Sequence, residues 1–566
     1  MVRCIMMLAW MLTVVAGRAV SAAILFVPDH FQNPQSALDA ANSGDTVIFR
    51  SGFYEAPLSI PARDITVGSE YILEPNESFI AGCVVRPGVS NPNVRCFDTE
   101  ATGGVSFELD LVGLTLQEAY AAGSDGGGIR IRNRMARVSN CVFKNCAASY
   151  GGAMFIDSSN LVLKESLIAG CDVSGQGRCF YAHASTVRAE YSTFSSSSAI
   201  MPNSSHQSEM IIDDSELFLS YCVVRNMGNS TDGRSTIILL SRSSVSDSMC
   251  IVNCLFEDNT LNKFTSGGSG TGMRTFVLDS CRIVNNAIAF GFLVDSEFDS
   301  LERAVITHNR FENNRRPGEN FNGTGLLSLR DPRVSWVVEG NFFLFNDGGV
   351  FSCISVSGNR DPAEFRVHRN YFGVNSNLGF TAPPGGAVMT IGLGEGICEY
   401  NAFVDNIDHA FDTWEFGSVG HALRNWWGDI TGPYVEIEHH DGRGDTTDAE
   451  TIYDEWLESA DEIPDTSLYP STVLDEPTIP STWNISKIYP NPFNSEFRID
   501  LTGITGADFE VRLYDLLGRE VALLHSGRTV GGTLSFSAPP NLATGLYFLR
   551  ASDRAYTVAT KALFLK

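Results

Sequence analysis

The chain has 566 residues, of which 43% are hydrophobic, so it is long enough for two or three domains or for one elongated domain. It carries 40 basic and 66 acidic residues, which gives a formal net charge of −26. This acidic excess disfavours nucleic acid and anionic lipid as partners, because both are bound through basic patches that displace counterions. The same surface charge repels polyuronates unless a basic groove compensates locally.

The first 22 residues have the pattern of a secretory signal peptide. Arg3 precedes an apolar run (residues 4–16), and the small residues 20–22 form a cleavage site before Ala23. A membrane anchor is the alternative, but Arg18 shortens the apolar span below the ~20 residues that a bilayer requires. No later segment is long and apolar enough to span a membrane. We therefore expect an exported mature chain without a transmembrane segment, which leaves 12 of the 13 cysteines in an oxidising compartment.

A short pattern recurs along the chain from residue 113 to residue 430. It is a small polar residue or Cys, then any residue, then a large apolar anchor, with Asn or a small polar residue two or three positions further on, as in NCVFKNC (140–146). The anchors are Leu116, Phe143, Ile168, Phe194, Val224, Phe256, Ile283, Phe311, Phe343, Phe372, Phe403 and Trp427. Successive anchors are 24–32 residues apart, a spacing that indicates a repeat protein.

Three repeat architectures have periods in this range: leucine-rich repeats, helical repeats and β-helices. The L-x-x-L-x-L frame is absent, and the segments are rich in Gly, Ser, Asn, Val and Phe rather than in helix formers. Short alternating runs such as GGIRIRN (127–133) are typical of strands. The sequence therefore predicts an all-β fold: a right-handed parallel β-helix over residues 23–460, with about twelve or more coils, three short strands per coil and insertions in the turns.

The register of the repeat assigns side chains to the interior. Side chains two apart on a strand point to the same side, so the anchor and the residue two before it both face the lumen. The earlier column comprises Cys141, Ser166, Ser192, Cys222, Cys254, Cys281, Asn309, Asn341, Asn370, Asn401 and Asn425. We expect these residues to stack as ladders and the anchors to form the core.

The cysteines have three interpretations: a reduced buried ladder, cross-coil disulfides or a metal site. A zinc site needs four converging ligands, and NCVFKNC has no His or Cys pair placed to complete one. Cys146 and Cys171 occupy matching turn positions in adjacent coils, about 4.8 Å apart and within the distance that a disulfide requires. A Cys146–Cys171 bridge is therefore the disulfide candidate.

Both ends of the repeat resemble pectin-lyase-like β-helix proteins. Residues 27–55 are similar to the opening of these proteins, which implies a capping helix from about Pro34 to Ala41 and a first strand that begins in GDTVIF (44–49). Residues 424–434 and 442–459 resemble their closing coil. An acidic, proline-containing stretch then predicts a linker over residues 461–477, and the alternating strands over 478–566 predict a small β-sandwich.

Several separated motifs in this last segment resemble the type A sorting domain of the bacterial type IX secretion system. They include Tyr489, Pro490, Asn491, Pro492, Phe493, Gly518, Gly545 and Tyr547. The resemblance implies outer-membrane secretion machinery as a partner, and a protein that is secreted or held at the cell surface after passing through the periplasm. An ordinary immunoglobulin-like accessory domain is the alternative.

Candidate catalytic and metal-binding residues are few. The residue series typical of polygalacturonases and pectate lyases is not recognisable, and Asp213–Asp214 stands alone. An Arg/His group about one coil apart offers a base and a charge neutraliser for a polysaccharide lyase; it comprises Arg330, Arg333, Arg366, His368 and Arg369. The alternative for this group is a solvated outer ladder of cross-coil ion pairs. No cofactor is expected, apart from calcium held by the loop residues Asp441, Asp445 and Asp448.

Two functions remain at this stage. The first is non-catalytic binding or adhesion to glycan or cell envelope, which the missing catalytic series favours. The second is a lyase or glycoside hydrolase acting on an acidic polysaccharide. A groove of convergent Arg, Lys and carboxylates would favour the enzyme, and a flat face of Ser, Thr and Asn would favour the binder.

Overall fold

The structure is a computed structural model. It describes residues 22–89, 91–99, 106–121, 123–195, 207–228, 235–241, 247–261, 263–267, 273–288, 301–315, 326–329, 334–347, 353–357, 365–376, 388–391, 397–407, 409–413, 420–436, 438–460, 484–490, 493–502, 507–514, 520–529, 532–539, 542, 545–552 and 557–564. The predicted linker (461–477) and all of the predicted signal peptide except Ala22 lie outside these residues.

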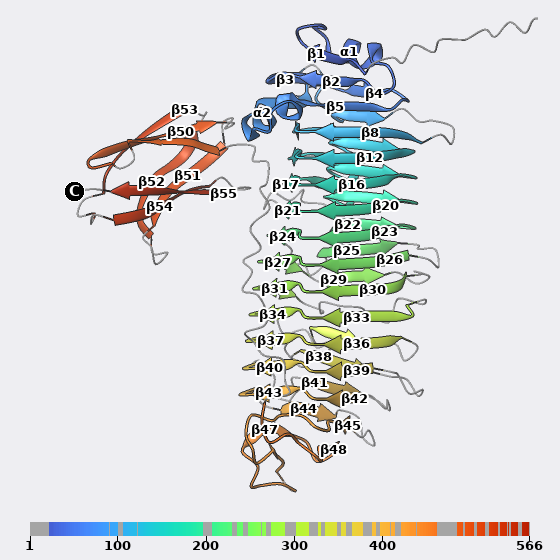
Figure 1. Cartoon of the computed structure of the whole chain (residues 1–566), viewed down its shortest axis with the longest axis vertical. Coiled ribbons are helices and arrows are strands. Elements are labelled where there is room, and N and C mark those ends of the chain that lie inside the picture. Colours follow the sequence, from blue (N-terminus) through green and yellow to red (C-terminus); the bar gives the residue numbers. More distant parts are fainter. Residues whose placement is uncertain are drawn as a thin grey trace, which may run out of the picture.

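The repeat forms a parallel β-helix whose coils stack along one axis, as Figure 1 shows, and the chain meets three sheets in turn as it winds. The first sheet has 14 strands: β1 (Ile24–Val27), β2 (Thr46–Phe49), β5 (Ile65–Ser69), β8 (Phe107–Val112), β12 (Arg134–Ser139), β16 (Asn160–Lys164), β20 (Thr186–Glu190), β23 (Glu216–Ser220), β26 (Asp247–Val252), β30 (Met273–Asp279), β33 (Arg303–Thr307), β36 (Ser335–Glu339), β39 (Phe365–His368) and β42 (Ile397–Glu399).

The second sheet has 13 strands: β3 (Gly52–Ala56), β6 (Cys83–Pro87), β9 (Thr115–Gln117), β13 (Val142–Lys144), β17 (Leu167–Ala169), β21 (Thr193–Ser195), β24 (Val223–Arg225), β27 (Leu255–Glu257), β31 (Arg282–Val284), β34 (Arg310–Glu312), β37 (Phe342–Leu344), β40 (Tyr371–Gly373) and β43 (Ala402–Val404). Each of these strands except β6 follows a strand of the 14-stranded sheet after a short corner.

The third position in the coil is divided between two sheets. The 8-stranded sheet comprises β4 (Leu58–Ile60), β7 (Phe97–Thr99), β11 (Ile129–Arg132), β15 (Met154–Asp157), β19 (Phe180–His183), β22 (Gln207–Asp213), β25 (Ser235–Ser241) and β29 (Lys263–Gly267). The 6-stranded sheet comprises β35 (Leu327–Leu329), β38 (Ile354–Ser357), β41 (Val388–Ile391), β44 (His409–Thr413), β47 (Gly444–Thr447) and β46 (Pro433–Tyr434). Short extra strands lie in the turns: β10 (Tyr120–Ala121), β14 (Ala147–Tyr150), β18 (Asp172–Gln176), β28 (Thr260–Leu261), β32 (Ala287–Ile288), β45 (Gly420–His421) and β48 (Thr451–Ile452).

A short helix closes the N-terminal end, as predicted. Helix α1 (Pro34–Ala40) begins where the Asn33 side chain accepts hydrogen bonds from the backbone N–H groups of Gln35 and Ser36, and it buries Leu38. The predicted first strand is wrong by one element, because the apolar strand β1 precedes the GDTVIF segment and pairs in parallel with β2. The short helices η1 (Glu70–Ile72) and α2 (Glu77–Gly82), which follow β5, were not predicted.

The two short corners of each coil explain the polar residues that flank the anchor. In the coil of NCVFKNC, both Asn140 and Asn145 have a φ of 53°, the left-handed conformation that turns the chain sharply and that Asn tolerates better than most residues. Equivalent corner residues include Glu165, Tyr191, Tyr221, Asn253, Ser280, His308, Arg369, Tyr400 and Arg424. These two corners join β13 to the strands before and after it along the chain, and they are too short to hold an insertion.

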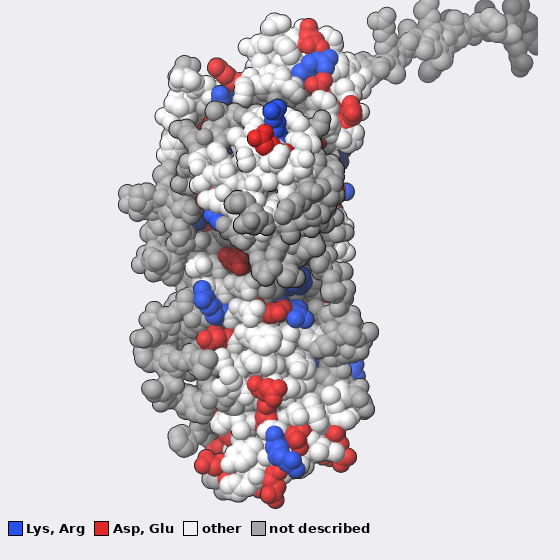
Figure 2. All heavy atoms as spheres, turned by 90° about the vertical axis from the view of Figure 1, so that its left-hand side faces the viewer, with Lys and Arg blue, Asp and Glu red and all other residues white. Residues whose placement is uncertain are grey.

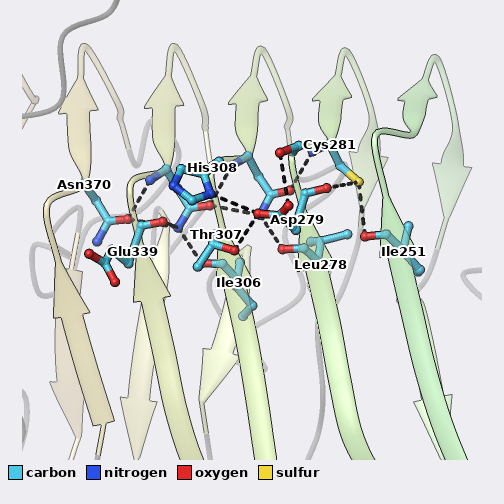
Figure 3. Close-up of polar contacts among 12 residues, drawn as sticks. Ile251, Leu278, Asp279, Cys281, Ile306, Thr307, His308, Glu339 and Asn370 are labelled. Carbon is cyan, nitrogen blue, oxygen red and sulfur yellow. Dashed lines mark hydrogen bonds and ion pairs between the residues drawn. The ribbon is translucent and has the colours of Figure 1, made fainter. Parts of the chain in front are cut away.

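The predicted ladder is confirmed on the inner side of the first corner, which joins the 14-stranded sheet to the 13-stranded sheet (Figure 3). The backbone N–H of Cys254 donates to the Cys281 sulfur at 3.4 Å, and the N–H of Cys281 donates to the side-chain oxygen of Asn309 at 2.8 Å. From Asn341 onward each asparagine accepts from the backbone and the amide nitrogen of the asparagine one coil earlier. A second ladder, Asn259, Asn286, Asn314, Asn346, Asn375 and Asn406, lies inside the other corner.

The anchors form the core beside these ladders, as predicted. Phe143 and Trp427 are fully buried, and the anchors of the last coils stack as a column of rings. The ring centroids of Phe343 lie 4.7 Å from Phe311 and 4.9 Å from Phe372, nearly parallel in both cases. This continuous interior joins the coils into one hydrophobic cluster.

The C-terminal segment forms two antiparallel sheets with a hydrophobic core of their own. One sheet comprises β49 (Asn484–Tyr489), β50 (Glu496–Thr502) and β53 (Gly532–Ser537). The other comprises β52 (Glu520–Thr529), β51 (Ala507–Tyr514), β54 (Gly545–Ser552) and β55 (Thr557–Phe564). The two sheets make the small β-sandwich that was predicted. None of the helices in the described part of the chain has the length and apolar character needed to cross a membrane.

Candidate functional site

The predicted Arg/His group is only partly described. Arg330 and Arg333 lie outside the described residues. His368, at the end of β39, lies 3.6 Å from Glu339 of the preceding coil, measured from Nδ1 to Oε1. Burial lowers the pKa of His368, and the nearby Arg369 and Arg366 act in the same direction, while Glu339 opposes them. The described members therefore stand at an outer corner, next to an acid one coil away.

Similar carboxylate–imidazole pairs recur at this corner (Figure 3). The Asp279 carboxylate accepts a hydrogen bond from the Thr307 hydroxyl at 2.6 Å and lies 3.0 Å from Nδ1 of His308. Both imidazoles contact an acid of the preceding coil and lie on the outside of the solenoid. This arrangement matches the alternative of cross-coil ion pairs along an outer ladder.

The three loop aspartates predicted for calcium do not point at a common centre. Asp441 is exposed, whereas one carboxylate oxygen of Asp445 accepts from the backbone N–H and the side-chain amide of Asn406, at 3.0 and 2.7 Å. Asp448 accepts from the N–H and the hydroxyl of Thr413, at 2.5 and 2.6 Å. Within the described residues, no group of three or more His, Cys, Asp or Glu side chains is placed to hold a metal ion.

Two acids in these last coils, Asp445 and Asp412, have a raised pKa. Burial raises the pKa of Asp445 to about 6, against the stabilising hydrogen bonds from Asn406. Burial likewise raises the pKa of Asp412 to about 6, with His409 opposing the shift and the Asp448 side chain adding to it. Asp445 ends the second asparagine ladder by taking the acceptor position of a further asparagine.

The predicted Cys146–Cys171 bridge is not formed in the structure, where all twelve described cysteines are free thiols. The Cys146 sulfur donates to the carbonyl of Leu116 at 3.5 Å, and the Cys171 sulfur donates to that of Ala169 at 3.7 Å. Burial raises the pKa of Cys171 well above its ordinary value, which suppresses the reactive thiolate. Cys222, Cys254 and Cys281 are members of the first ladder, each linked to the next by a backbone N–H that donates to a sulfur.

The predicted sorting motif lies in the C-terminal sandwich. Phe493 is buried and packs against Phe497 and Phe564, with ring centroids 4.4 and 5.2 Å away. The Tyr489 hydroxyl donates to Asp500 at 3.1 Å, and Tyr547 is buried in the core. Gly545 begins β54 and Pro490 is exposed; Asn491, Pro492 and Gly518 lie outside the described residues.

The outer face of the 8-stranded sheet carries a polar and aromatic cluster that the repeat pattern did not reveal. In-register pairing places Asp98, Arg130, Phe155, Tyr181 and Ile211 in one column across five strands. A parallel column comprises Arg132, Asp157, His183 and Asp213. Side chains two apart on a strand share a face, so both columns lie outside, opposite the buried Ile129 and Ile131 columns.

Three guanidinium groups converge on one carboxylate at the start of this face; we call Arg95, Arg130 and Arg132 the arginine cluster. Arg130 makes a two-pronged contact with Asp98, at 3.0 and 2.6 Å. Arg95 donates to the same carboxylate at 2.7 Å, and Arg132 lies 3.6 Å away. Burial opposes ionisation of Asp98, but the Arg130 hydrogen bond and the three positive charges outweigh it and hold its pKa below the ordinary value.

Three aromatic rings lie beside the arginine cluster; we call Tyr150, Phe155 and Tyr181 the aromatic cluster. Phe155 and Tyr181 are half-buried and stack with centroids 5.4 Å apart, and Tyr150 meets Tyr181 edge-on at 5.5 Å. Tyr150 is 43% exposed, so its ring offers apolar surface to a ligand. Exposed aromatic side chains next to fixed polar groups are a common composition of ligand sites.

A shared carboxylate fixes two further groups on the same face. One oxygen of Asp213 accepts from the Tyr181 hydroxyl at 2.9 Å and contacts Nδ1 of His183 at 3.1 Å. The imidazole is 48% exposed, so its other ring nitrogen is available outside. Burial and the Asp213 hydrogen bond raise the pKa of Tyr181, which keeps its hydroxyl protonated.

The charges elsewhere on the surface are mixed. On the face shown in Figure 2, basic and acidic side chains stand close together, and acidic ones gather at the lower end. Asp213 stands out in the sequence, but its partners Tyr181 and His183, about one coil earlier, do not. They lie beside it through the pairing of β19 with β22, whose register the variable anchor spacing does not give.

Comparison with known proteins identifies the C-terminal domain. Residues 487–565 match the family model of the secretion system C-terminal sorting domain. No curated protein matches the chain.

Three solved structures resemble the chain in part. A mannuronic acid specific polysaccharide family 6 lyase from human gut microbiota is 14% identical, with 78% of this chain and 84% of that chain covered and a TM-score of 0.34. A family 6 polysaccharide lyase from Pseudopedobacter saltans is 10% identical, covering 76% and 92%, with a TM-score of 0.26. A tailspike protein of an E. coli bacteriophage, in complex with a pentasaccharide, is 10% identical, covering 93% and 88%, with a TM-score of 0.31.

Proposed function

We propose that this protein is a non-catalytic, glycan-binding protein of the cell surface or the medium, and that it binds its ligand on the outer face of the 8-stranded sheet. The C-terminal sorting domain indicates export by the secretion machinery of the outer membrane. The β-helix is then the exported part, displayed outside the cell. Its binding function rests on the site described above.

The observation that carries the proposal is the position of the aromatic cluster between two sets of fixed polar groups. Within the aromatic cluster, Phe155 is the in-register neighbour of Arg130 on one side. On the other side the Tyr181 hydroxyl donates to Asp213, which also contacts His183. A pyranose has an apolar face of C–H groups and a rim of hydroxyls, so it needs both kinds of contact at once. In-register strands lie about 4.8 Å apart along the axis, so the column presents a different side chain at each such step to an extended chain of sugars.

Binding of the purified mature chain to an immobilised panel of uncharged and acidic polysaccharides tests the proposal. Tyr150→Ala should weaken binding about threefold to tenfold, because an aromatic contact contributes about 0.5–1.5 kcal/mol. Tyr191→Ala is the matched control: Tyr191 is 40% exposed and stacks on Tyr221 at 4.9 Å, at a corner away from the site. Equal affinities of the two variants, or no binding to any glycan, would contradict the proposal.

A second candidate is a lyase acting on an acidic polysaccharide, and the Asp213–His183 pair favours it. Asp213 orients the imidazole, as a general base requires. His183 would remove the proton next to the uronate carboxylate, and the electron pair would form a double bond as the glycosidic oxygen leaves. Product absorbing near 235 nm, made by the wild type but not by His183→Ala, would establish this activity in place of simple binding.

A further inference from the structure

The arginine cluster already holds an anion of its own. The carboxylate of Asp98 receives hydrogen bonds from Arg95 and Arg130 within 2.6–3.0 Å and lies 3.6 Å from Arg132. Forked contact of this kind is how guanidinium groups bind the carboxylate or sulfate of a ligand. The cluster therefore has the form of an occupied anion site.

Two further acids next to the arginine cluster balance the positive charge that Asp98 does not neutralise. Asp125 is close enough that Arg130 and Arg95 lower its pKa, against the larger opposing effect of its burial. Asp157 is the in-register neighbour of Arg132 on β15. The three arginines are thus matched by Asp98, Asp125 and Asp157, in a chain whose formal net charge is −26.

We propose that Asp98 is the specificity-determining residue of this face: its carboxylate occupies the place of an acidic sugar substituent, so that the face accepts uncharged glycans and rejects acidic ones. This inference rests on the glycan binding proposed above. An acidic ligand has to displace a carboxylate that is tethered in place, or else bring further negative charge beside Asp125 and Asp157. An uncharged sugar needs no displacement, because its hydroxyls can hydrogen-bond to the outer edges of the same groups.

Parts of the guanidinium groups stay accessible to such ligands, because 21% of the Arg130 side chain and 28% of the Arg132 side chain are exposed. Among the described residues, the Nε atoms of Arg95 and Arg132 have no hydrogen-bond partner, but both are buried, so a ligand on the surface does not reach them. Removal of the Asp98 charge frees the Arg95 and Arg130 donors that now bind its carboxylate, and an anion can then take its place.

The test compares Asp98→Asn with the wild type in the full mature chain, with dextran and dextran sulfate as probes that share a backbone and differ in their anionic sulfate groups. Asp110→Asn is the matched control, because Asp110 makes the same forked contact with Arg137, at 2.6 and 3.3 Å, on the 14-stranded sheet. We expect Asp98→Asn to bind dextran sulfate at least about tenfold more tightly than either the wild type or the control. Adding Arg130→Gln to Asp98→Asn should remove the gain.

Several outcomes would overturn the inference. One is an equal gain in Asp98→Asn and Asp110→Asn, which would reflect net charge alone. Another is tight binding of dextran sulfate by the wild type that is lost in Arg130→Gln, which would show an open anion site. If Asp98→Asn lowers the melting temperature markedly, Asp98→Ser, whose hydroxyl can still contact Arg130, is measured instead. Failure of the proposed function shows separately, as the absence of Tyr150-dependent binding to any glycan.

Discussion

The asparagine ladder should be a main source of the stability of the solenoid, and Asn341→Ala tests this directly. The Asn341 side chain is fully buried and makes five hydrogen bonds. Its oxygen accepts from the backbone N–H and the amide of Asn309, both at 2.9 Å. Its nitrogen donates to the carbonyls of Ile306 and Glu339 and to the side chain of Asn370, at 2.8, 3.2 and 2.9 Å.

Alanine at this position leaves two buried donors without an acceptor. The Asn309 amide keeps one bond, to the Leu278 carbonyl, and the Asn370 oxygen keeps the backbone N–H of residue 341. The backbone N–H of Asn309 and the second N–H of its side-chain amide both lose the Asn341 oxygen. A hydrogen bond contributes about 1 kcal/mol net, and an unsatisfied buried donor costs about 1–3 kcal/mol. We therefore expect Asn341→Ala to lower the free energy of unfolding by about 3–5 kcal/mol.

The assay is urea unfolding of the purified mature chain together with hydrogen exchange, since a repeat protein can open locally at the damaged coil. Exchange should speed up most in the coils that contain Asn309 and Asn341. The matched control is Asn313→Gly, because Asn313 is an exposed corner residue with a φ of 52° that glycine adopts freely. If Asn341→Ala falls within about 0.5 kcal/mol of this control, the ladder is not a stabilising element and the reasoning is refuted.

Four further measurements test other parts of the structure. Because the pKa of Asp445 in the folded chain is about 6, against an ordinary value of 3.8, its stabilising contribution is present at low pH and is lost as the pH rises through about 6. Asp445→Asn, which can still accept from Asn406, should therefore raise the free energy of unfolding at pH 7 by about 2–3 kcal/mol, and no gain at pH 7 would contradict the assignment. Phe343→Ala should lower the free energy of unfolding by about 3–5 kcal/mol by breaking the ring column; a loss below 1 kcal/mol would show that the column is dispensable. Thiol titration should find twelve free thiols after denaturation but only slow reaction of the half-buried Cys250 in the native chain, whereas fewer than twelve would reveal a disulfide. Phe493→Ala should leave the chain in the periplasm by destabilising the sorting domain, and undiminished export measured by immunoblotting of the medium and cell surface would count against this.

The sequence predicted two of the three faces of the solenoid because its corners are too short to vary. The anchor Phe143 lies between two left-handed corner residues, and the same arrangement returns in every coil from Leu116 to Phe403 whose corners are described, so the columns can be aligned by eye. Small polar residues in the ladder column and apolar anchors two positions later then follow from the alternation of a strand. The periodicity thus specified which residues are buried, including the cysteines.

The third face could not be aligned in this way, because insertions separate it from the anchors. Phe143 is followed by the buried Met154 of β15, whereas Phe194 is followed by Met210 of β22 after a longer connection. The distance from anchor to outer strand therefore changes from coil to coil. The partnership between His183 and Asp213 depends on that register, which only the strand pairing supplies.

The same constraint explains why the candidate site lies on the third face. A binding site needs positions where side chains can change without disturbing the interior, and the two short corners offer few of them, because each is followed directly by a ladder residue such as Asn309. Even the polar groups at those corners, such as His308 and His368, face acids of the preceding coil. On the 8-stranded sheet the inward-facing side chains fill the interior. The outward-facing positions can therefore hold arginine, aspartate and aromatic residues together. The ladders keep the coils in register, and that register sets the spacing between the arginine cluster and the aromatic cluster that a glycan would meet.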